Sequence, residues 1–98
     1  MEIEYRSAIC ERLEVDGAFT GGYAVAIVTK FRMRIQAIRA AVDERAFYEL
    51  KSLHFEKLKG DRTGQYSMRL NDQWRLILEF KKNASGKIVV VIGIEDYH

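Results

Sequence analysis

An arginine in the last third of the chain stands where it could bind a phosphate group. Arg75 lies between Trp74 and Leu76 in a run that alternates like a β-strand. If these two apolar residues face the core, alternation directs Arg75 to the open face of a sheet. A guanidinium in that position can bind a phosphate with two parallel hydrogen bonds. The competing interpretation is a surface ion pair with Glu79, which lies on the same face of the strand.

Further cations surround a glycine turn that precedes this strand. Lys59 and Arg62 flank Gly60, and the backbone amides of such a loop can hold a phosphate together with the two cations. Lys57 and Arg69 lie on either side of the turn, and we expect both of them, with Arg62, to contact RNA. Turns of this composition are also common in solvated hairpins, so the motif alone is not specific.

The chain ends on three residues that could take part in proton transfer. Asp96, Tyr97 and His98 closely follow an apolar strand-like run, residues 87–94, which should anchor them. Tyrosine can stack on a base, histidine can exchange a proton near neutral pH, and aspartate can accept a proton or orient a neighbour. The alternative is a solvated polar tail. His54, taken alone, is typical of a structural or surface histidine.

The sequence offers little for metal or nucleotide cofactor chemistry. Its two histidines are far apart, it has one cysteine, and it has no paired acidic motif, so no metal-ligand spacing is present. There is no glycine-rich fingerprint of a nucleotide site. We therefore expect no metal and no other cofactor. A single cysteine, Cys10, also excludes a disulfide within the chain.

Length and composition indicate one small globular domain over residues 1–98. Hydrophobic residues make up 48% and charged residues 31% of the chain, a balance typical of folded proteins. No apolar run approaches the roughly 20 residues of a membrane helix, and the N-terminus lacks the pattern of a secretory signal. We therefore expect a cytoplasmic protein without a membrane partner.

The net charge of +2 is unevenly distributed along the chain. Residues 23–42 contain four basic residues and no acidic residue, whereas residues 1–22 carry an acidic balance. Basic patches within a nearly balanced total favour a local site for a polyanion over general coating of nucleic acid.

Residues 23–42 should form the main helix, since apolar residues recur there at spacings of three and four. This stripe consists of Ala24, Ile27, Val28, Phe31, Ile35, Ile38 and Val42. Lys30, Arg34 and Arg39 fall outside the stripe. These three cations form either a solvated face or a surface that contacts ribosomal RNA.

Two short helices and a set of strands complete the expected fold. Ser7 can cap a helix that ends near Val15, and Asp43 can cap one that runs to about Lys51. The period then changes to that of strands, which we expect over residues 1–5, 55–58, 66–70, 73–80 and 87–94. This order predicts an α+β domain in which a small antiparallel sheet is packed on one face by the N-terminal helices.

Four motifs together resemble those of the HigB toxins, which belong to the RelE/ParE superfamily of type II toxin–antitoxin systems. They are Leu58-Lys59-Gly60-Asp61-Arg62, Gly64-Gln65-Tyr66-Ser67-Met68-Arg69, Asn71-Asp72-Gln73-Trp74-Arg75 and Glu95-Asp96-Tyr97-His98. Their order, spacing and terminal position match over residues 56–98, whereas residues 1–55 match in length and helical layout. The resemblance implies a RelE-like fold and a toxin that enters the ribosomal A site and cuts mRNA. It also implies a HigA-type helix-turn-helix antitoxin that neutralises the toxin.

The resemblance implies roles for individual residues. Lys59 and Arg75 match the family's cationic residues at the cleaved phosphate. Asp96, Tyr97 and His98 match its C-terminal active-site triplet. The implied chemistry needs no metal: a 2′-hydroxyl attacks the adjacent phosphate and leaves a 2′,3′-cyclic phosphate and a 5′-hydroxyl. In this scheme His98 acts as the acid, and Tyr97 stacks on or orients the nucleotide.

One position departs from the family pattern and leaves the general base open. Some members carry a histidine three residues before the matching lysine, where this chain has Glu56. His54 lies two residues earlier and, in a strand, would share a face with Glu56. The base is therefore Glu56, His54 or Asp96.

Two other functions remain compatible with the sequence. One is a ParE-like toxin that inhibits gyrase by binding it, although the terminal triplet disfavours this. The other is a non-catalytic RNA-binding domain of the same fold, which the departure at Glu56 favours.

Overall fold

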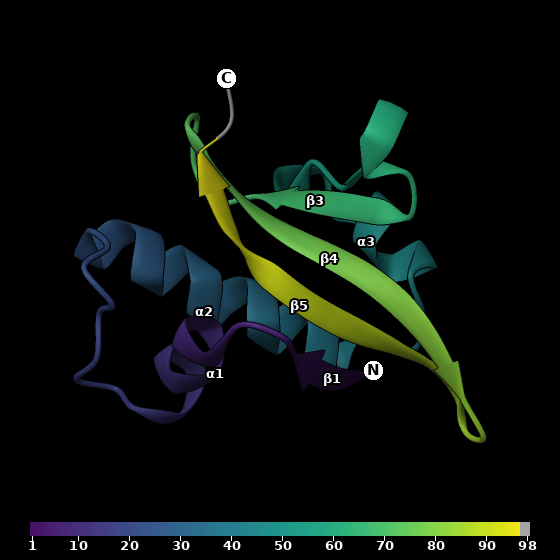
Figure 1. Cartoon of the computed structure of the whole chain (residues 1–98), viewed down its shortest axis with the longest axis horizontal. Coiled ribbons are helices and arrows are strands. Elements are labelled where there is room, and N and C mark those ends of the chain that lie inside the picture. Colours follow the sequence, from purple (N-terminus) through teal and green to yellow (C-terminus); the bar gives the residue numbers. More distant parts are fainter. Residues whose placement is uncertain (97–98) are drawn as a thin grey trace.

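The computed structural model describes residues 1–96, and the predicted site residues Tyr97 and His98 lie outside this range. Figure 1 shows a twisted sheet with helices α1 and α2 on one side of it. The elements are β1 (Glu2–Tyr5), α1 (Ala8–Val15), α2 (Val25–Ala40), α3 (Arg45–Glu49), the 3₁₀ turn η1 (Lys51–Leu53), β2 (Glu56–Lys57), the 3₁₀ turn η2 (Gly60–Arg62), β3 (Gln65–Arg69), β4 (Trp74–Asn83) and β5 (Gly86–Asp96). No helix in the described range is long and apolar enough to cross a membrane.

Five strands form one sheet in the order β1-β5-β4-β3-β2. Strands β2 to β5 pair antiparallel with their neighbours, as predicted, whereas β1 pairs parallel with β5. The α+β fold is therefore confirmed, with the correction that the sheet is mixed. The long helical connection between β1 and the later strands permits this parallel pairing. The most apolar strand, β5, lies second from the edge, and β4 is central.

The helices begin and end close to their predicted positions. Ser7 caps α1, since its Oγ accepts a hydrogen bond from the backbone N–H of Cys10 at 3.1 Å. Helix α2 covers Val25–Ala40, two residues shorter at each end than predicted. Helix α3 begins at Arg45 rather than directly after Asp43, although Asp43 Oδ1 does accept from the N–H of Arg45 at 2.9 Å.

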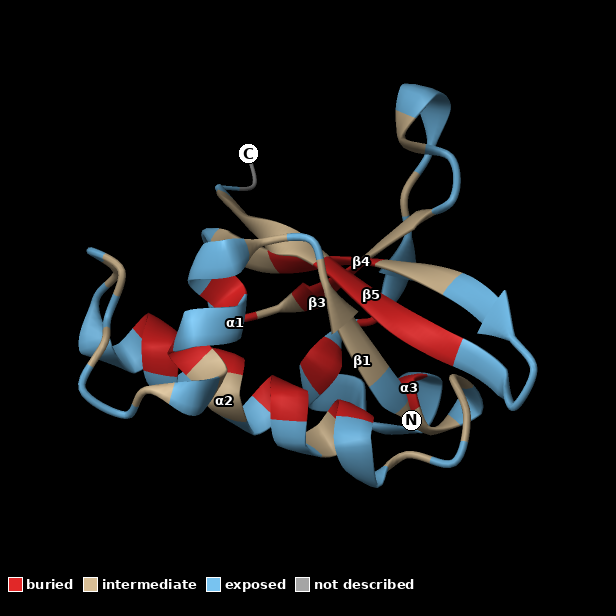
Figure 2. Cartoon of the chain, turned by 60° about the horizontal axis from the view of Figure 1, so that its bottom comes forward, coloured by how far each residue is buried: buried red, intermediate tan, exposed pale blue. Residues whose placement is uncertain are grey.

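The core lies between the helices and one face of the sheet, and buried residues gather there in Figure 2. Phe31 and Ile38 of α2 and Leu76 and Leu78 of β4 are all 0% exposed and belong to one apolar cluster. Burial of apolar surface is the main stabilising term in such a domain. The helices cover only this face. The opposite face carries charged side chains of β4 and β5, and three residues that are also directed to it are buried, namely Ser67, Ile77 and Val90.

A β-bulge in β5 decides which way the end of that strand points. The register between β4 and β5 shifts by one residue at Ile92, which is left without a partner. Val91 before the bulge packs in the core. Because the extra residue reverses the alternation, Ile94 also packs against the core, and Glu95 is directed to the open face.

A carboxylate joins α1 to β1 and to α2. Glu14 Oε1 accepts a hydrogen bond from the Tyr5 hydroxyl at 2.8 Å. Arg39 donates from Nε to Glu14 Oε2 at 2.6 Å and from Nη2 to Oε1 at 2.7 Å. The hydrogen bonds from Arg39, and more weakly that from Tyr5, hold the pKa of Glu14 below its ordinary value, against the opposing effect of burial. Arg39, one of the three cations outside the apolar stripe, is thus paired rather than merely solvated.

The Glu14–Arg39 pair should stabilise the fold only while Glu14 is ionised. Its folded-state pKa lies below the ordinary 4.5, so the stabilisation is complete above the unfolded-state pKa and is lost as pH falls through the folded-state pKa. In a double-mutant cycle with Glu14→Gln and Arg39→Gln, we expect a coupling energy of about 1 kcal/mol at neutral pH. Urea unfolding followed by circular dichroism measures it. A coupling energy that stays constant down to strongly acidic pH would contradict the assignment.

Candidate functional site

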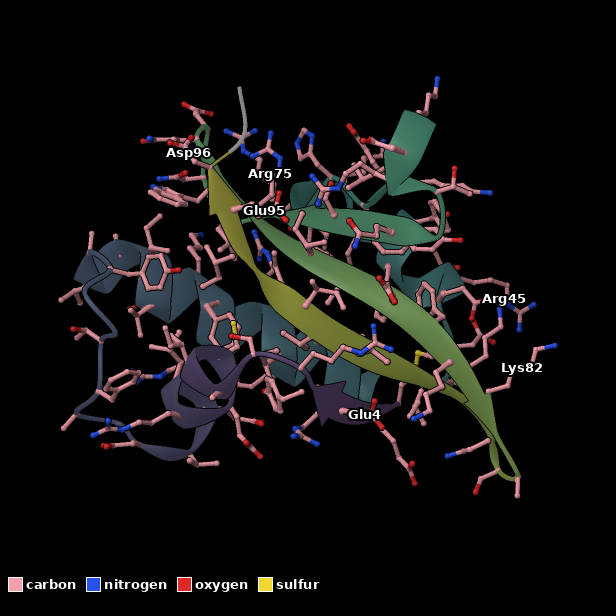
Figure 3. All side chains as sticks on the ribbon, viewed as in Figure 1. Glu4, Arg45, Arg75, Lys82, Glu95 and Asp96 are labelled. Carbon is pink, nitrogen blue, oxygen red and sulfur yellow. The ribbon has the colours of Figure 1, made fainter. Side chains whose placement is uncertain are left out.

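A row of three charged residues crosses the open face of the sheet at the end where β5 finishes. Arg75 of β4 lies opposite Arg69 of β3 on one side and opposite Glu95 of β5 on the other. Residues directly opposite each other point to the same face. Trp74 and Leu76 belong to the core side, so the predicted outward direction of Arg75 is confirmed. Figure 3 shows Arg75 and Glu95 together at this end of the sheet.

The two arginines of this row are held by the corner that joins β3 to β4. Like charges directly opposite one another in a sheet repel, and nearby acceptors offset the repulsion. Arg69 Nη2 forms an ion pair with Asp72. Arg75 Nη1 donates to the backbone carbonyl of Asn71 at 2.6 Å. The corner therefore fixes where both guanidinium groups lie.

Arg62 is bound by Glu95, a carboxylate to which the sequence assigned no role. Its Nη1 and Nη2 donate to the two oxygens of Glu95 at 2.9 and 2.8 Å, and its Nε donates to Gln65 Oε1 at 2.7 Å. Gln65 Nε2 and Arg6 Nη1 in turn donate to the carboxylate of Glu79, each at 3.1 Å. Glu79 is the residue considered as an alternative partner of Arg75. Arg62 was predicted to contact RNA, and a phosphate that binds it must displace Glu95.

Lys59 immediately precedes the tight turn η2. The first residue of this turn, Gly60, has a φ of +69°, which glycine adopts without strain. The turn brings Arg62 to the sheet and leaves Lys59 exposed. The predicted glycine turn between two cations is therefore present, and their joint contact with a phosphate stays a prediction.

Strand β2 lies at the edge of the sheet, beside β3. Glu56 pairs with Ser67 of β3, so it shares the open face with Arg75 but lies one row further along. Lys57 pairs with Tyr66, which packs against the core, so Lys57 points to the opposite face. The structure thus places Glu56, but not Lys57, on the face that carries the row.

His54 does not lie in a strand, and the expected shared face with Glu56 is therefore wrong. It follows η1 with φ 44° and ψ 51°, a left-handed conformation that ends the turn. Strand β2 begins only at Glu56. The exposed His54 side chain instead lines a surface pocket together with Arg69.

Asp96 ends the described part of β5. It lies opposite Trp74 and is therefore directed away from the face that carries Glu95. Its Oδ2 accepts a hydrogen bond from Gln73 Nε2 at 3.0 Å. In Figure 3 Asp96 and Arg75 lie at the same end of the sheet. The other two members of the predicted triplet follow Asp96 and lie outside the described residues.

Arg34 lies next to this site and is buried, contrary to its expected place on the outer face of α2. It is 8% exposed. Its Nε donates to the carbonyl of Arg69 at 2.9 Å, and its Nη2 donates to the carbonyl of Ser52 at 3.3 Å. Burial and, to a lesser extent, nearby Arg69 lower the pKa of Arg34 from its ordinary value. Its position directly before Ile35 and three residues after Phe31, at the margin of the apolar stripe, was the signal that could have indicated burial.

The site combines groups that bind anions with groups that accept protons. Guanidinium groups of Arg62, Arg69 and Arg75 lie on the open face, where Glu95 is also found. Asp96 lies at the same end of the sheet. Within residues 1–96 no three His, Cys, Asp or Glu side chains gather as ligands for a metal ion. The arrangement therefore suits a phosphodiester whose neighbouring hydroxyl loses a proton.

Comparisons with known proteins identify a matching family and solved structures of similar fold. The family described as the RelE-like toxin of the type II toxin–antitoxin system HigB matches residues 4–98. The solved YoeB/ParE toxin from Agrobacterium tumefaciens has a TM-score of 0.60 and 18% identity, over 100% of both chains. The YoeB–YefM complex from Staphylococcus aureus has a TM-score of 0.57 and 19% identity, over 100% of this chain and 97% of the other chain. At these identities the solved structures show a shared fold. No curated protein sequence matches the chain.

Replacing Glu95 by glutamine should strengthen the binding of RNA. The substitution removes the carboxylate that competes with a phosphate for Arg62 and keeps the size of the side chain. For a short RNA strand that 2′-O-methyl groups make uncleavable, we expect the Kd to fall roughly two- to fivefold, or about 0.5–1 kcal/mol. Isothermal titration calorimetry measures the change.

Glu4→Gln is the matched control for Glu95→Gln. Glu4 pairs with Lys81 on the same sheet, far from Arg75 (Figure 3), and its loss removes the same charge. Weaker binding by the Glu95 variant, with the control unchanged, would show that this carboxylate supports RNA binding instead of competing with it.

Proposed function

Because the chain belongs to the RelE-like HigB toxins of type II toxin–antitoxin systems, we propose that it is an endoribonuclease that cuts mRNA on the ribosome and so inhibits translation. The observation that carries this proposal is the row of Arg69, Arg75 and Glu95 on the open face of the sheet. Fixed cations beside carboxylates suit a reaction in which negative charge builds up on a phosphate. No helix of the N-terminal half covers this face in Figure 1, so an extended strand can lie across it.

In the proposed reaction a 2′-oxygen attacks the adjacent phosphorus, and the bond from phosphorus to the next 5′-oxygen breaks. A base takes the proton of the 2′-hydroxyl, and an acid gives a proton to the leaving 5′-oxygen. The products are a 2′,3′-cyclic phosphate and a 5′-hydroxyl. In this proposal Arg75 and Lys59 stabilise the negative charge that builds up at phosphorus in the transition state. The proposed reaction uses no metal ion.

The proposed base is Asp96 or Glu56. Asp96 lies at the end of the sheet where Arg75 lies (Figure 3), but its register position directs it to the opposite face. Glu56 shares the face of Arg75 but lies on β2, which β3 separates from β4. His54 precedes β2 and instead lines the pocket beside the corner. For His98 as the acid and Tyr97 as the residue that orients the nucleotide, the support is the match to the family, which extends to residue 98.

The proposed dependence on the ribosome follows from how little the protein alone constrains an RNA strand. The row lies on an open face, and Arg62 is already bound to Glu95. Attack by the 2′-oxygen requires it to lie opposite the leaving 5′-oxygen, and such alignment can account for most of the rate of a phosphoryl transfer. A ribosome that holds the mRNA in its A site supplies this alignment, so free RNA should be cut poorly.

The proposed partner is a small helix-turn-helix antitoxin of the HigA type, which binds the toxin in the cytoplasm. A toxin of this fold has been solved in complex with its antitoxin, in the heterotetrameric YoeB–YefM complex from Staphylococcus aureus. Co-expression with the neighbouring reading frame tests the assignment. The two proteins should co-purify and growth should recover, and failure of both would contradict it.

Cleavage of one mRNA should require that the mRNA is bound to ribosomes. Single-turnover reactions with programmed ribosomes and with the same mRNA free in solution are to be compared. Equal cutting in the two samples would contradict the ribosome dependence. No cutting in either would favour the gyrase-inhibiting or non-catalytic function.

Arg75→Ala should slow cleavage on programmed ribosomes by about 100- to 1,000-fold, because it removes a cation that stabilises the transition state. The melting temperature should change little, since the side chain points away from the core and its loss leaves no cavity there. Lys82→Ala is the matched control, an exposed cation on the same strand toward its other end (Figure 3). Full activity of a folded Arg75 variant would remove Arg75 from the site, and a collapsed melting temperature would make its role structural.

A further inference from the structure

A basic pocket adjoins the candidate site and has no role in the reaction as described above. It lies between α2, η1 and the corner that joins β3 to β4, and its volume is about 440 Å³. Lys30, Arg34, His54 and Arg69 contribute to its lining. Asp72 is the carboxylate at its rim. The pocket is therefore open to solvent on a side where cationic side chains predominate.

The buried guanidinium of Arg34 has no carboxylate partner among residues 1–96. Its hydrogen-bond acceptors there are the carbonyls of Arg69 and Ser52, at 2.9 and 3.3 Å, which are dipoles without net charge. Asp72 is paired with Arg69, and its side chain is 94% exposed. A charge taken out of water is costly unless an opposite charge accompanies it. The lowered pKa of Arg34, caused first by burial and then by Arg69, shows the same imbalance.

We propose that this pocket binds a phosphate group of RNA, as a second subsite beside the phosphate that is cut. The phosphate would supply the negative charge that Arg34 lacks and would be reached by Lys30 from the exposed side of α2. The choice of RNA as the ligand rests on the proposed function. The anionic character of the ligand rests on Arg34 and on the lining of the pocket.

The pocket is continuous with the row on the open face. Asn71 lines the pocket, and its carbonyl accepts a hydrogen bond from Arg75 Nη1 at 2.6 Å. Arg69 both lines the pocket and lies opposite Arg75 in the row. A strand bound at Arg75 can therefore pass over the corner into the pocket. A phosphate held there would fix the position of the strand relative to Arg75.

The test substitution is Lys30→Ala. Lys30 is exposed on α2, and alanine favours the helix, so the fold should be kept. Lys82→Ala removes the same charge toward the other end of the sheet and serves as the control (Figure 3). For each full-length protein the affinity is measured over a range of salt concentrations. One arm uses an uncleavable 2′-O-methyl strand, and the other uses ribosomes without mRNA.

We expect Lys30→Ala to weaken binding roughly three- to tenfold at moderate salt, with no change in the control. The plot of log association constant against log salt concentration has a negative slope. Its magnitude should become smaller by about 0.7, the value for one phosphate contact on a single strand. Weaker binding of the free strand assigns the phosphate to mRNA. Weaker binding of ribosomes alone assigns it to ribosomal RNA. Equal affinities of the Lys30 and Lys82 variants in both arms would overturn the proposal.

A titration with inorganic phosphate reports on the pocket directly. The Arg34 Nε–H, which is held by the carbonyl of Arg69, should shift saturably with phosphate in nuclear magnetic resonance spectra. The shift should be smaller in the Lys30 variant than in the Lys82 variant. A shift no larger than that caused by chloride at equal ionic strength would also overturn the proposal. Neither measurement depends on cleavage, so their failure leaves the proposed nuclease activity intact, and a protein that cuts no RNA can still fill this pocket.

Discussion

The β-bulge at Ile92 is the constraint on which the candidate site depends. It reverses the alternation of β5, so that Ile94 stays in the core while Glu95 joins Arg75 on the open face. In an unbroken strand Glu95 would point into the helix-covered core and Asp96 to the open face. One extra residue thus decides which carboxylate lies beside Arg75. Bulges commonly re-aim side chains in this way next to functional sites.

The charges around the site fall into two classes with different consequences. At the surface Arg62 is bound by Glu95, and Arg69 is bound by Asp72. Exposed ion pairs of this kind contribute only about 0–1 kcal/mol to the stability of a fold. A phosphate of the proposed RNA ligand would therefore replace either carboxylate at small cost. Arg34 is different, because it is buried and its acceptors are carbonyl groups. It ties α2 to the end of β3 and fixes the corner from which Arg75 is held.

Local patterns in the sequence predicted those features that depend on neighbouring residues. Polar and apolar residues alternate around Arg75, so its direction could be inferred, and the helix cap at Ser7 followed from the adjacent residues. The bulge could not be inferred, because residues 88–92 are all apolar and mark no face. The parallel pairing of β1 depends on contacts distant in sequence. The left-handed conformation at His54 falls on a residue other than glycine, and such residues seldom adopt it, so the sequence contained no signal of it. The place of Arg34 at the margin of the apolar stripe could have indicated its burial, but its acceptors, two backbone carbonyls from later segments, could not be inferred from the pattern of side chains.

The activity proposed for the open face is the cleavage of mRNA during translation. The most direct measurement is to map new RNA 5′ ends in cells after brief induction of the protein, with and without a prior block of translation. We expect new 5′-hydroxyl ends inside translated reading frames, at a constant distance from the ribosomal A site, and their disappearance when translation is blocked. Growth arrest without new ends, or equal cutting of untranslated RNA, would contradict the account.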